Sequence, residues 1–255
     1  MIASVEDWRT LRSLNCPVCG SSDLRTIYES RNSPTQINFL YATREKAVAC
    51  PRGDIRLAVC GECDLIVNTA FDPSKLVYRE GYENALHHSS VFQTYADTLV
   101  ERLIAGFDLK KKTIVEVGCG DGTFLRSLCE RGGNRGIGFD PSAPATAGDG
   151  EARSDIRIIR DYFSEAYADI GPDFVYSRHT LEHVWDPMTL LRPLRRTLED
   201  TKGIPVFFEV PNGLYTLEKA FIWEPPDFSE IDESKVSDWW ARSVTFPDNF
   251  NFQNH

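Results

Sequence analysis

The sequence contains no apolar run that approaches the roughly 20 residues of a membrane-spanning helix. Its N-terminal segment lacks the basic start and apolar core of a secretion signal. Basic residues are in deficit, because 28 Lys and Arg stand against 38 Asp and Glu. The net charge of −10 leaves no basic excess to neutralise phosphates, which argues against nucleic acid as a partner. We therefore expect a cytoplasmic protein that binds neither membranes nor nucleic acid.

The sequence has seven cysteines. Because no secretion signal accompanies them, metal binding is favoured over disulfides. Four of them form two C-x-x-C pairs, Cys16 with Cys19 and Cys60 with Cys63. Each pair has a glycine beside it, Gly20 or Gly61, and together they offer four thiolates to one tetrahedral structural zinc. The alternatives are a small cysteine core or a redox pair. Cys50 could replace a ligand, whereas Cys119 and Cys129 are interpreted as buried fillers.

From Ser89 onward, helix and strand patterns alternate. Apolar residues at helical spacing follow a possible Ser89 or Ser90 cap. Glycine-bounded apolar runs predict five strands, and helical patterns separate some of them. The strands fall at 113–118, 136–140, 156–161, 173–177 and 204–210, with helices at 123–132 and 187–198. This alternation predicts an α/β fold with a Rossmann-like parallel sheet and helices on both faces. We expect a zinc-binding lobe at 1–85, a core at 86–224 and a tail at 225–255.

A glycine loop, "VEVGCGDGTF", stands between the first strand and the first helix of this core. It places Gly118, Gly120 and Gly122 in a G-x-G-x-G pattern, which differs from the dinucleotide fingerprint at the third glycine. A pyrophosphate favours a helix N-terminus free of acidic groups. Glu116 and Asp121 flank this turn instead, and they suit a ligand with a sulfonium and an amino group, such as S-adenosylmethionine.

Carboxylates follow the next two strands, where open α/β sheets bind their ligands. Asp140 can accept hydrogen bonds from both ribose hydroxyls, and Asp161 can accept one from an adenine amino group, with Tyr162 or Phe163 on the ring. Each residue alone has an alternative interpretation. Glu116 could be an ordinary loop acid, Asp140 a helix cap and Tyr162 a core residue. Their order on successive strand ends favours the cofactor site.

The stretch "SRHTLEH" contains H-x-x-E-H, the ligand pattern of inverted zincin peptidases. On a helix, His179 and His183 would share one face and could bind one zinc ion. The stretch directly follows a predicted strand, however, so His179 is expected at the strand end and need not share a helical face with His183. A zinc peptidase would also need a further acidic ligand, for which Glu209 and Glu218 are candidates. It would not require the cofactor motifs upstream, so it remains the less favoured alternative.

Taken in order, these motifs resemble the class I S-adenosylmethionine-dependent methyltransferases, and more closely the branch with an N-terminal zinc-binding domain that includes nucleotide-sugar C-methyltransferases. The resemblance rests on the cysteine pairs, "FDPSKLVYREGYENALHHSSVFQTYA", "VEVGCGDGTFL", "GFDPS", "RDYFSE", "SRHTLEHVWDP" and "FFEVPN". It covers roughly residues 14–223. Residues 225–255 do not resemble the C-terminal part of that family, so we expect a diverged or shortened tail.

The resemblance implies cofactor contacts at Gly118, Gly120, Asp140 and Asp161, and we assign Arg178 to the same site. It also implies that His183 and Tyr82 face a small polar methyl acceptor, such as a nucleotide-linked sugar. Because the pKa of histidine is near neutral, His183 can remove the acceptor's proton, while Tyr82 can polarise the acceptor. The alternatives are a structural cap for His183 and, for the whole chain, a catalytically impaired relative that binds a cofactor or partner. His179 is interpreted as a packing residue beside the cofactor.

Overall fold

The computed structural model describes residues 15–35, 41–75, 89–144, 155–184, 186–198 and 203–212, and the backbone of 244–245. The chain forms two compact units, Met1–Ala85 and Leu86–His255. Each unit is described by itself.

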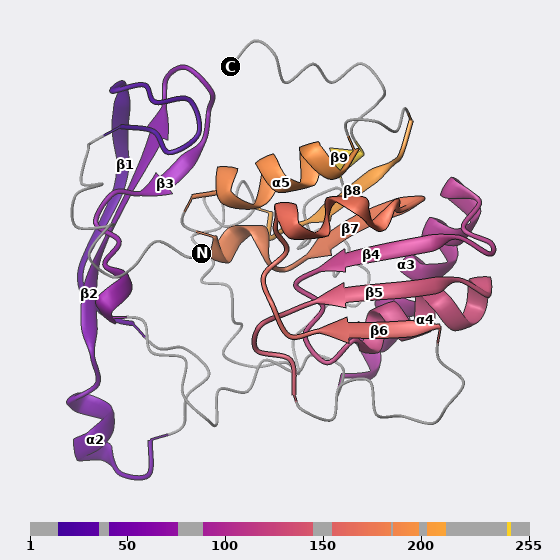
Figure 1. The fold of residues 1–255 in the computed structure, drawn as a ribbon. Coiled ribbons are helices and arrows are strands. Elements are labelled where there is room, and N and C mark those ends of the chain that lie inside the picture. Colours follow the sequence, from indigo (N-terminus) through magenta and orange to yellow (C-terminus); the bar gives the residue numbers. More distant parts are fainter. Residues whose placement is uncertain are drawn as a thin grey trace. The chain divides into compact units, whose positions relative to one another are not determined.

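The first unit contains a three-stranded antiparallel sheet in the order β1-β2-β3 (Figure 1). Its elements are β1 (Leu24–Pro34), α2 (Arg44–Val48), β2 (Arg52–Cys60), β3 (Ile66–Asn68) and the 3₁₀ turn η1 (Pro73–Lys75). Among its described residues only Cys16, Ala58 and Cys60 are buried apolar side chains. A unit of this size with so small a core needs another source of stability.

The second unit is built on a sheet in the order β6-β5-β4-β7-β8-β9, in which the first five strands are parallel. Its helices are α3 (Ser90–Phe107), α4 (Thr123–Gly132), α5 (Met188–Leu198) and the 3₁₀ turns η3 (Glu165–Ile170) and η4 (Leu181–His183). Its strands are β4 (Thr113–Val117), β5 (Arg135–Phe139), β6 (Ile156–Ile159), β7 (Phe174–Arg178), β8 (Val206–Glu209) and β9 (Val244–Thr245). The five strands and three helices predicted in this unit are confirmed. The short antiparallel β9 pairs with β8 and adds one strand from the tail.

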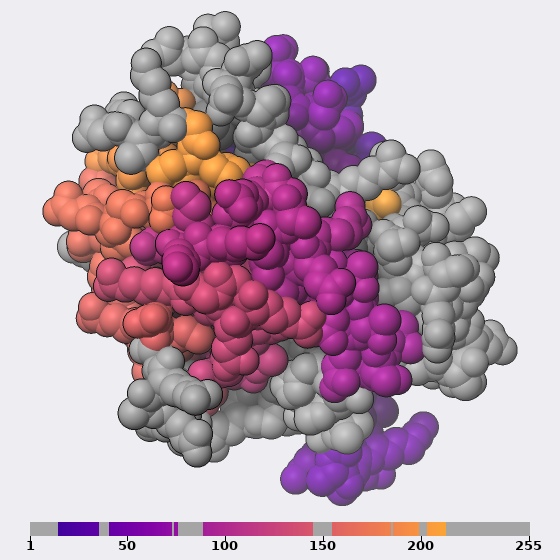
Figure 2. Space-filling model, turned by 90° about the vertical axis from the view of Figure 1, so that its right-hand side faces the viewer, coloured from indigo at the N-terminus to yellow at the C-terminus, as the bar shows by residue number. Residues whose placement is uncertain are grey.

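Helices cover both faces of the parallel sheet, as predicted. Along each strand successive side chains point to opposite faces. In β4, Ile114 packs in a cluster with α3 and α4, whereas Val115 packs in a second cluster with α5. Figure 1 shows α3 and α4 on one face and α5 on the other, and in Figure 2 the outer surfaces of α3 and α4 adjoin.

Local sequence explains the placement of these helices. Ser89 caps α3, because its side chain accepts a hydrogen bond from the Phe92 N–H. Helix α4 and the glycine loop before it pack tightly on β5 because that strand carries glycines where side chains would collide. A Cβ on Gly136 would lie 2.8 Å from Cys129 Sγ, and one on Gly138 would lie 2.6 Å from Cys119 Sγ. Both cysteines are thus the buried fillers that the sequence predicts.

The strand order reverses between β4 and β7. From β4 the chain adds β5 and β6 on one side, and then crosses to add β7 and β8 on the other. In open α/β sheets ligands bind at such a reversal, beyond the carboxyl ends of the strands. The segments that follow β4 and β7 are the glycine loop and "HTLEH". None of the helices in the described part of the chain is long and apolar enough to cross a membrane.

Candidate functional site

The glycine loop after β4 has a backbone that requires glycine. Gly118, Gly120 and Gly122 all adopt left-handed conformations, with φ of 78°, 55° and 79°. A Cβ on Gly118 would lie 1.9 Å from Thr180 Oγ1, so the loop closely approaches the segment that follows β7. Gly122 begins α4 without a capping side chain. The first backbone N–H groups of α4, which have no partners within the helix, therefore lie next to the glycine loop.

The predicted carboxylates lie along the same edge of the sheet. Asp140 follows β5, and its Oδ2 accepts a 2.8 Å hydrogen bond from the Gly120 N–H. Asp161 follows β6, and its Oδ2 accepts a 2.8 Å hydrogen bond from the Tyr167 hydroxyl. Tyr162 has 53% of its surface exposed and is not a core residue, which removes the alternative given above for this side chain. Asp140 and the glycine loop are directly connected.

Glu116 lies within β4 and not in the loop that follows it. Its side chain is buried on the face covered by α3 and α4, beside Tyr176 of the neighbouring strand. Burial raises the pKa of Glu116 to about 8, although Tyr176 and Arg178 oppose this shift. Neither Glu116 Oε2 nor the Tyr176 hydroxyl makes a hydrogen bond of good geometry with any residue the structure describes. The carboxyl group is thus a buried acceptor with unused capacity.

Arg178, predicted to bind the cofactor, is buried at the end of β7. Its guanidinium lies over the Phe124 ring, 3.9 Å from the centroid, and pairs with Glu209, with 2.7 Å between Arg178 Nη2 and Glu209 Oε1. Sequence reasoning missed Glu209 as a partner, because it lies 31 residues further along the chain. The neighbouring parallel strands β7 and β8 bring the two residues together in register.

The two histidines do not share a helical face. His179 has a left-handed backbone with φ of 52°, and His183 ends the three-residue turn η4. Desolvation lowers the pKa of both rings. It also raises the pKa of Glu182 to about 7, with Glu209 adding to the effect. His183 and Glu182 keep much of their surface exposed. Tyr82, the other predicted catalytic residue, lies outside the described residues.

In the first unit, the four paired cysteines converge. Their sulfur atoms all lie within 4.8 Å of one another, with 3.5 Å between Cys16 and Cys63 and between Cys19 and Cys60. In the described part of the chain this is the one group of three or more side chains arranged to hold a metal ion. Cys50 is not among its members. The four thiols do not share one electrostatic environment, because a backbone hydrogen bond from Glu62 lowers the pKa of Cys60 to about 7, whereas burial raises the pKa of Cys63 to about 12.

The two cysteine turns share one backbone hydrogen-bond pattern. The sequence pattern pairs Gly20 with Gly61, and the structure replaces Gly61 in that pair. In the first turn the Gly20 N–H donates to the Cys16 carbonyl at 2.9 Å, and in the second the Asp64 N–H donates to the Cys60 carbonyl at 3.0 Å. Gly20 and Asp64 are both left-handed. Asp64, not Gly61, is therefore the counterpart of Gly20. Gly61 instead allows close approach, since a Cβ there would lie 1.9 Å from Asp23 Oδ2.

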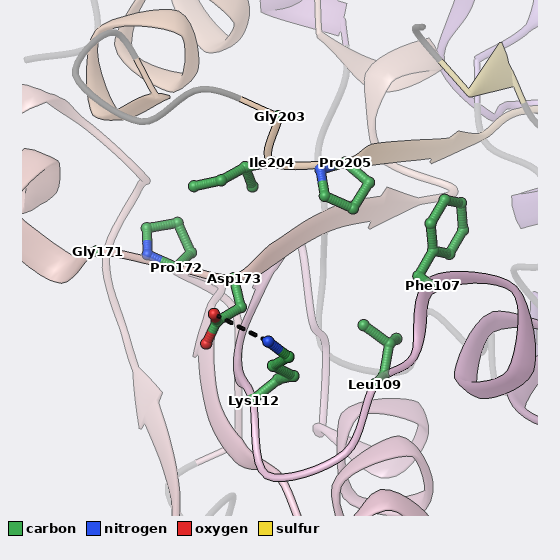
Figure 3. A pocket seen from close by; sticks show the side chains of 9 residues that line it. All are labelled: Phe107, Leu109, Lys112, Gly171, Pro172, Asp173, Gly203, Ile204 and Pro205. Atoms are coloured by element: carbon green, nitrogen blue, oxygen red, sulfur yellow. Dashed lines mark ion pairs between the residues drawn. The ribbon is translucent and has the colours of Figure 1, made fainter. Parts of the chain in front are cut away.

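A pocket of about 560 Å³ lies at the opposite edge of the sheet (Figure 3). It is lined near the start of β4, β7 and β8 by Lys112, Asp173 and Pro205, and Lys112 Nζ lies 3.6 Å from Asp173 Oδ1. This pocket is therefore at the amino ends of the strands and is separate from the glycine loop.

Comparisons with known proteins identify the family. Residues 87–251 match the family described as "Methyltransferase domain". A 2-ketoarginine methyltransferase from Streptomyces arginensis is 37% identical over 81 residues, which are 29% of this chain and 23% of that protein. The chain thus spans less than a quarter of the length of this curated relative.

Solved structures with a similar fold include an S-adenosylmethionine-dependent methyltransferase from Mesorhizobium loti, with 23% identity, a TM-score of 0.39 and coverage of 48% of this chain and 58% of that one. Another is the magnesium protoporphyrin IX methyltransferase of Synechocystis with bound SAH, with 19% identity, a TM-score of 0.40 and coverage of 56% and 68%. Because the family match spans more than half of the sequence, it carries the assignment. The chain belongs to the methyltransferase-domain family, that is, to the S-adenosylmethionine-dependent methyltransferases.

Proposed function

We propose that the protein binds S-adenosylmethionine at the carboxyl edge of its parallel sheet and transfers the methyl group to a small polar acceptor, at carbon or oxygen. The observation that carries this proposal is the set formed by the left-handed glycine loop, Asp140 bonded to it, and the buried carboxyl of Glu116. The bound cofactor supplies an activated methyl group, and the protein's own task is to align the acceptor and take its proton.

The residues of this edge fit the cofactor's chemistry. A buried carboxyl without a full set of partners is costly, and a ligand ammonium group would supply the missing donors. We assign Glu116, Gly118, Gly120 and Gly122 to the amino-acid end of the cofactor. Asp140 is assigned to the ribose, and Asp161 with the exposed ring of Tyr162 to the adenine. Arg178 is assigned a supporting role in the same site.

For the acceptor side we propose His183 as the base and Tyr82 as a polarising donor, as the family resemblance implies. The position of His183 after β7 supports this, since Thr180 of the same segment lies against the glycine loop. The lowered pKa of His183 keeps its imidazole neutral at neutral pH, which a base requires. The acceptor class we favour is a nucleotide-linked keto sugar. The local similarity to a 2-ketoarginine methyltransferase makes a 2-oxo acid the second candidate.

The cysteine cluster is proposed to hold one structural zinc. For a Zn–S bond of about 2.3 Å, tetrahedral geometry places sulfur atoms about 3.8 Å apart, and the spacing here fits that value. The ion would replace the core that the first unit has too few buried side chains to form. The peptidase alternative has less support, because among the described residues His179 and His183 belong to no group of three or more side chains arranged to hold a metal ion.

Methyl transfer from labelled S-adenosylmethionine tests the proposal. The zinc-replete chain is incubated with nucleotide keto sugars and 2-oxo acids, alongside His183→Ala and a control variant, Glu165→Gln, whose exposed carboxylate pairs with Arg196. We expect acceptor-dependent transfer that His183→Ala lowers by about 10²-fold or more, the range of a general base. Cofactor binding without transfer to any acceptor of either class would favour the competing function, a catalytically impaired cofactor-binding relative.

A further inference from the structure

The carboxylate of Glu209 at the end of β8 gathers three side chains from other elements. It is 2% exposed. Its Oε2 accepts a 2.6 Å hydrogen bond from the Tyr95 hydroxyl of α3. Its Oε1 lies 2.7 Å from Arg178 Nη2 and 2.8 Å from His179 Nε2. None of these contacts joins neighbours in the sequence, so the fold has to assemble them.

This buried carboxylate remains charged because its partners lower its pKa by more than burial raises it. Burial alone would raise the pKa of Glu209, but the hydrogen bond from His179 and the charge of Arg178 lower it to about 2. Burial also lowers the pKa of His179, so that ring is neutral at neutral pH and carries one proton. Because a carboxylate only accepts hydrogen bonds, that proton belongs on Nε2. The contact of Nε2 with Arg178 Nη2 is longer, at 3.4 Å.

His179 is tied to Glu209 at both its ring and its backbone. The His179 N–H donates to the Glu209 carbonyl at 2.9 Å, in addition to the side-chain contact. The left-handed backbone of His179 is unfavourable for a residue with a Cβ and persists only where the surroundings impose it. The double attachment to Glu209 is what imposes it here.

The turn held in this way leads directly to the acceptor side. The Thr180 hydroxyl donates to the Arg178 carbonyl at 3.0 Å, and the His183 N–H donates to the Thr180 carbonyl at 2.9 Å. Thr180 in turn packs against Gly118 of the glycine loop. A shift at His179 would therefore move both Thr180 and His183 relative to that loop.

We propose that Glu209 is the positioning residue of the transferase site: it fixes His179 as the Nε2-protonated tautomer and thereby holds the Thr180–His183 turn against the glycine loop. Tyr95 completes the arrangement by tying helix α3 to the same carboxylate. The inference rests on the proposed function, because it assigns Glu209 to the placement of the acceptor-side base. Glu209 does not itself contact the reacting atoms in this account.

The experiment combines ¹⁵N NMR of the histidine rings with steady-state kinetics. His179 signals are assigned from their absence in His179→Gln. In the zinc-replete full-length chain we expect an Nε2-protonated His179. Glu209→Gln, which keeps the shape and removes the charge, should abolish this tautomer preference and lower kcat by at least about tenfold, with KM and the affinity for S-adenosylhomocysteine changed by less than about threefold.

Two further variants keep the test decisive. Tyr95→Phe removes the hydroxyl that donates to Glu209 and spares the His179 contact. It should lower kcat by only a few-fold and leave the His179 tautomer unchanged. This variant remains informative if Glu209→Gln fails to fold. Glu165→Gln is the matched surface control. An Nδ1-protonated His179 in the wild-type chain, or equal kcat in wild type and Glu209→Gln, would overturn the inference. A wild-type chain with the expected tautomer and no transferase activity would contradict the proposed function and leave the Glu209 geometry intact.

Discussion

At the scale of single residues, Glu116 is the least expected feature of the second unit. It stands between the buried residues Val115 and Val117 in a central strand, where an ionised carboxylate is unfavourable. A residue that served only the core would be apolar. Its raised pKa and its buried Oε2 are the observations from which we propose that this position serves the cofactor, at the expense of stability.

Glu116→Gln tests this trade-off through pH. The pKa of the Glu116 carboxyl is near 4.5 in the unfolded chain and about 8 in the folded chain, so the folded state binds the proton more tightly. The resulting contribution to stability is lost as pH rises from about 5 to above 8. The glutamine stays neutral. We expect the variant to lose less stability than the wild type between pH 6 and pH 9, by on the order of 1–4 kcal/mol, in denaturant titrations. The exposed Glu101→Gln should follow the wild type, and parallel pH curves for Glu116→Gln and wild type would contradict the account.

The sequence predicted the residues of the carboxyl edge better than it predicted their contacts. Gly118, Asp140 and Asp161 could be assigned because each directly follows a recognisable strand. The role of Glu209 was not predictable, since it depends on side chains of Tyr95 and His179 that only the folded sheet brings to it. Glu116 falls inside the strand predicted at 113–118, and the structure places it in β4, which removes the alternative of an ordinary loop acid.

At the scale of elements, alternating apolar patterns and glycine boundaries sufficed to predict the five parallel strands and three helices. The cysteine turns show the limit of such reasoning. Their common hydrogen bonds depend on a left-handed residue four positions after the first cysteine, which is Gly20 in one turn and Asp64 in the other. Asp tolerates this conformation better than most residues, but nothing in its identity alone required it.

The zinc proposal belongs to this scale, because it concerns the two turns and the sheet that joins them. We expect about one zinc per chain, as measured by elemental analysis after dialysis. Cys60→Ser should abolish zinc binding and greatly weaken the protection of β2 against hydrogen exchange, because the first unit has few buried side chains. Cys50→Ser, outside the cluster, should retain the zinc. Loss of zinc in His179→Gln with retention in Cys60→Ser would point to the peptidase arrangement instead.

At the scale of the whole molecule, the chain combines an antiparallel, cysteine-held unit with a doubly wound unit that carries the methyltransferase match. The second unit can be understood from its strand order alone. The reversal between β4 and β7 places the glycine loop beside the turn that contains His183, and these are the two segments to which we assign the cofactor and the acceptor. At this edge of the sheet we propose that S-adenosylmethionine binds.

The most direct measurement is a calorimetric titration of the zinc-replete chain with S-adenosylhomocysteine, repeated on Asp140→Ala. The matched control is Asp155→Ala, an exposed carboxylate just before β6 at the amino edge of the sheet. We predict saturable binding by the wild type and by Asp155→Ala, and a loss of at least about 30-fold in affinity for Asp140→Ala, as expected when a charged hydrogen-bond acceptor is removed. Absence of binding to the wild type, or equal affinity in all three proteins, would contradict the assignment of this edge as the cofactor site.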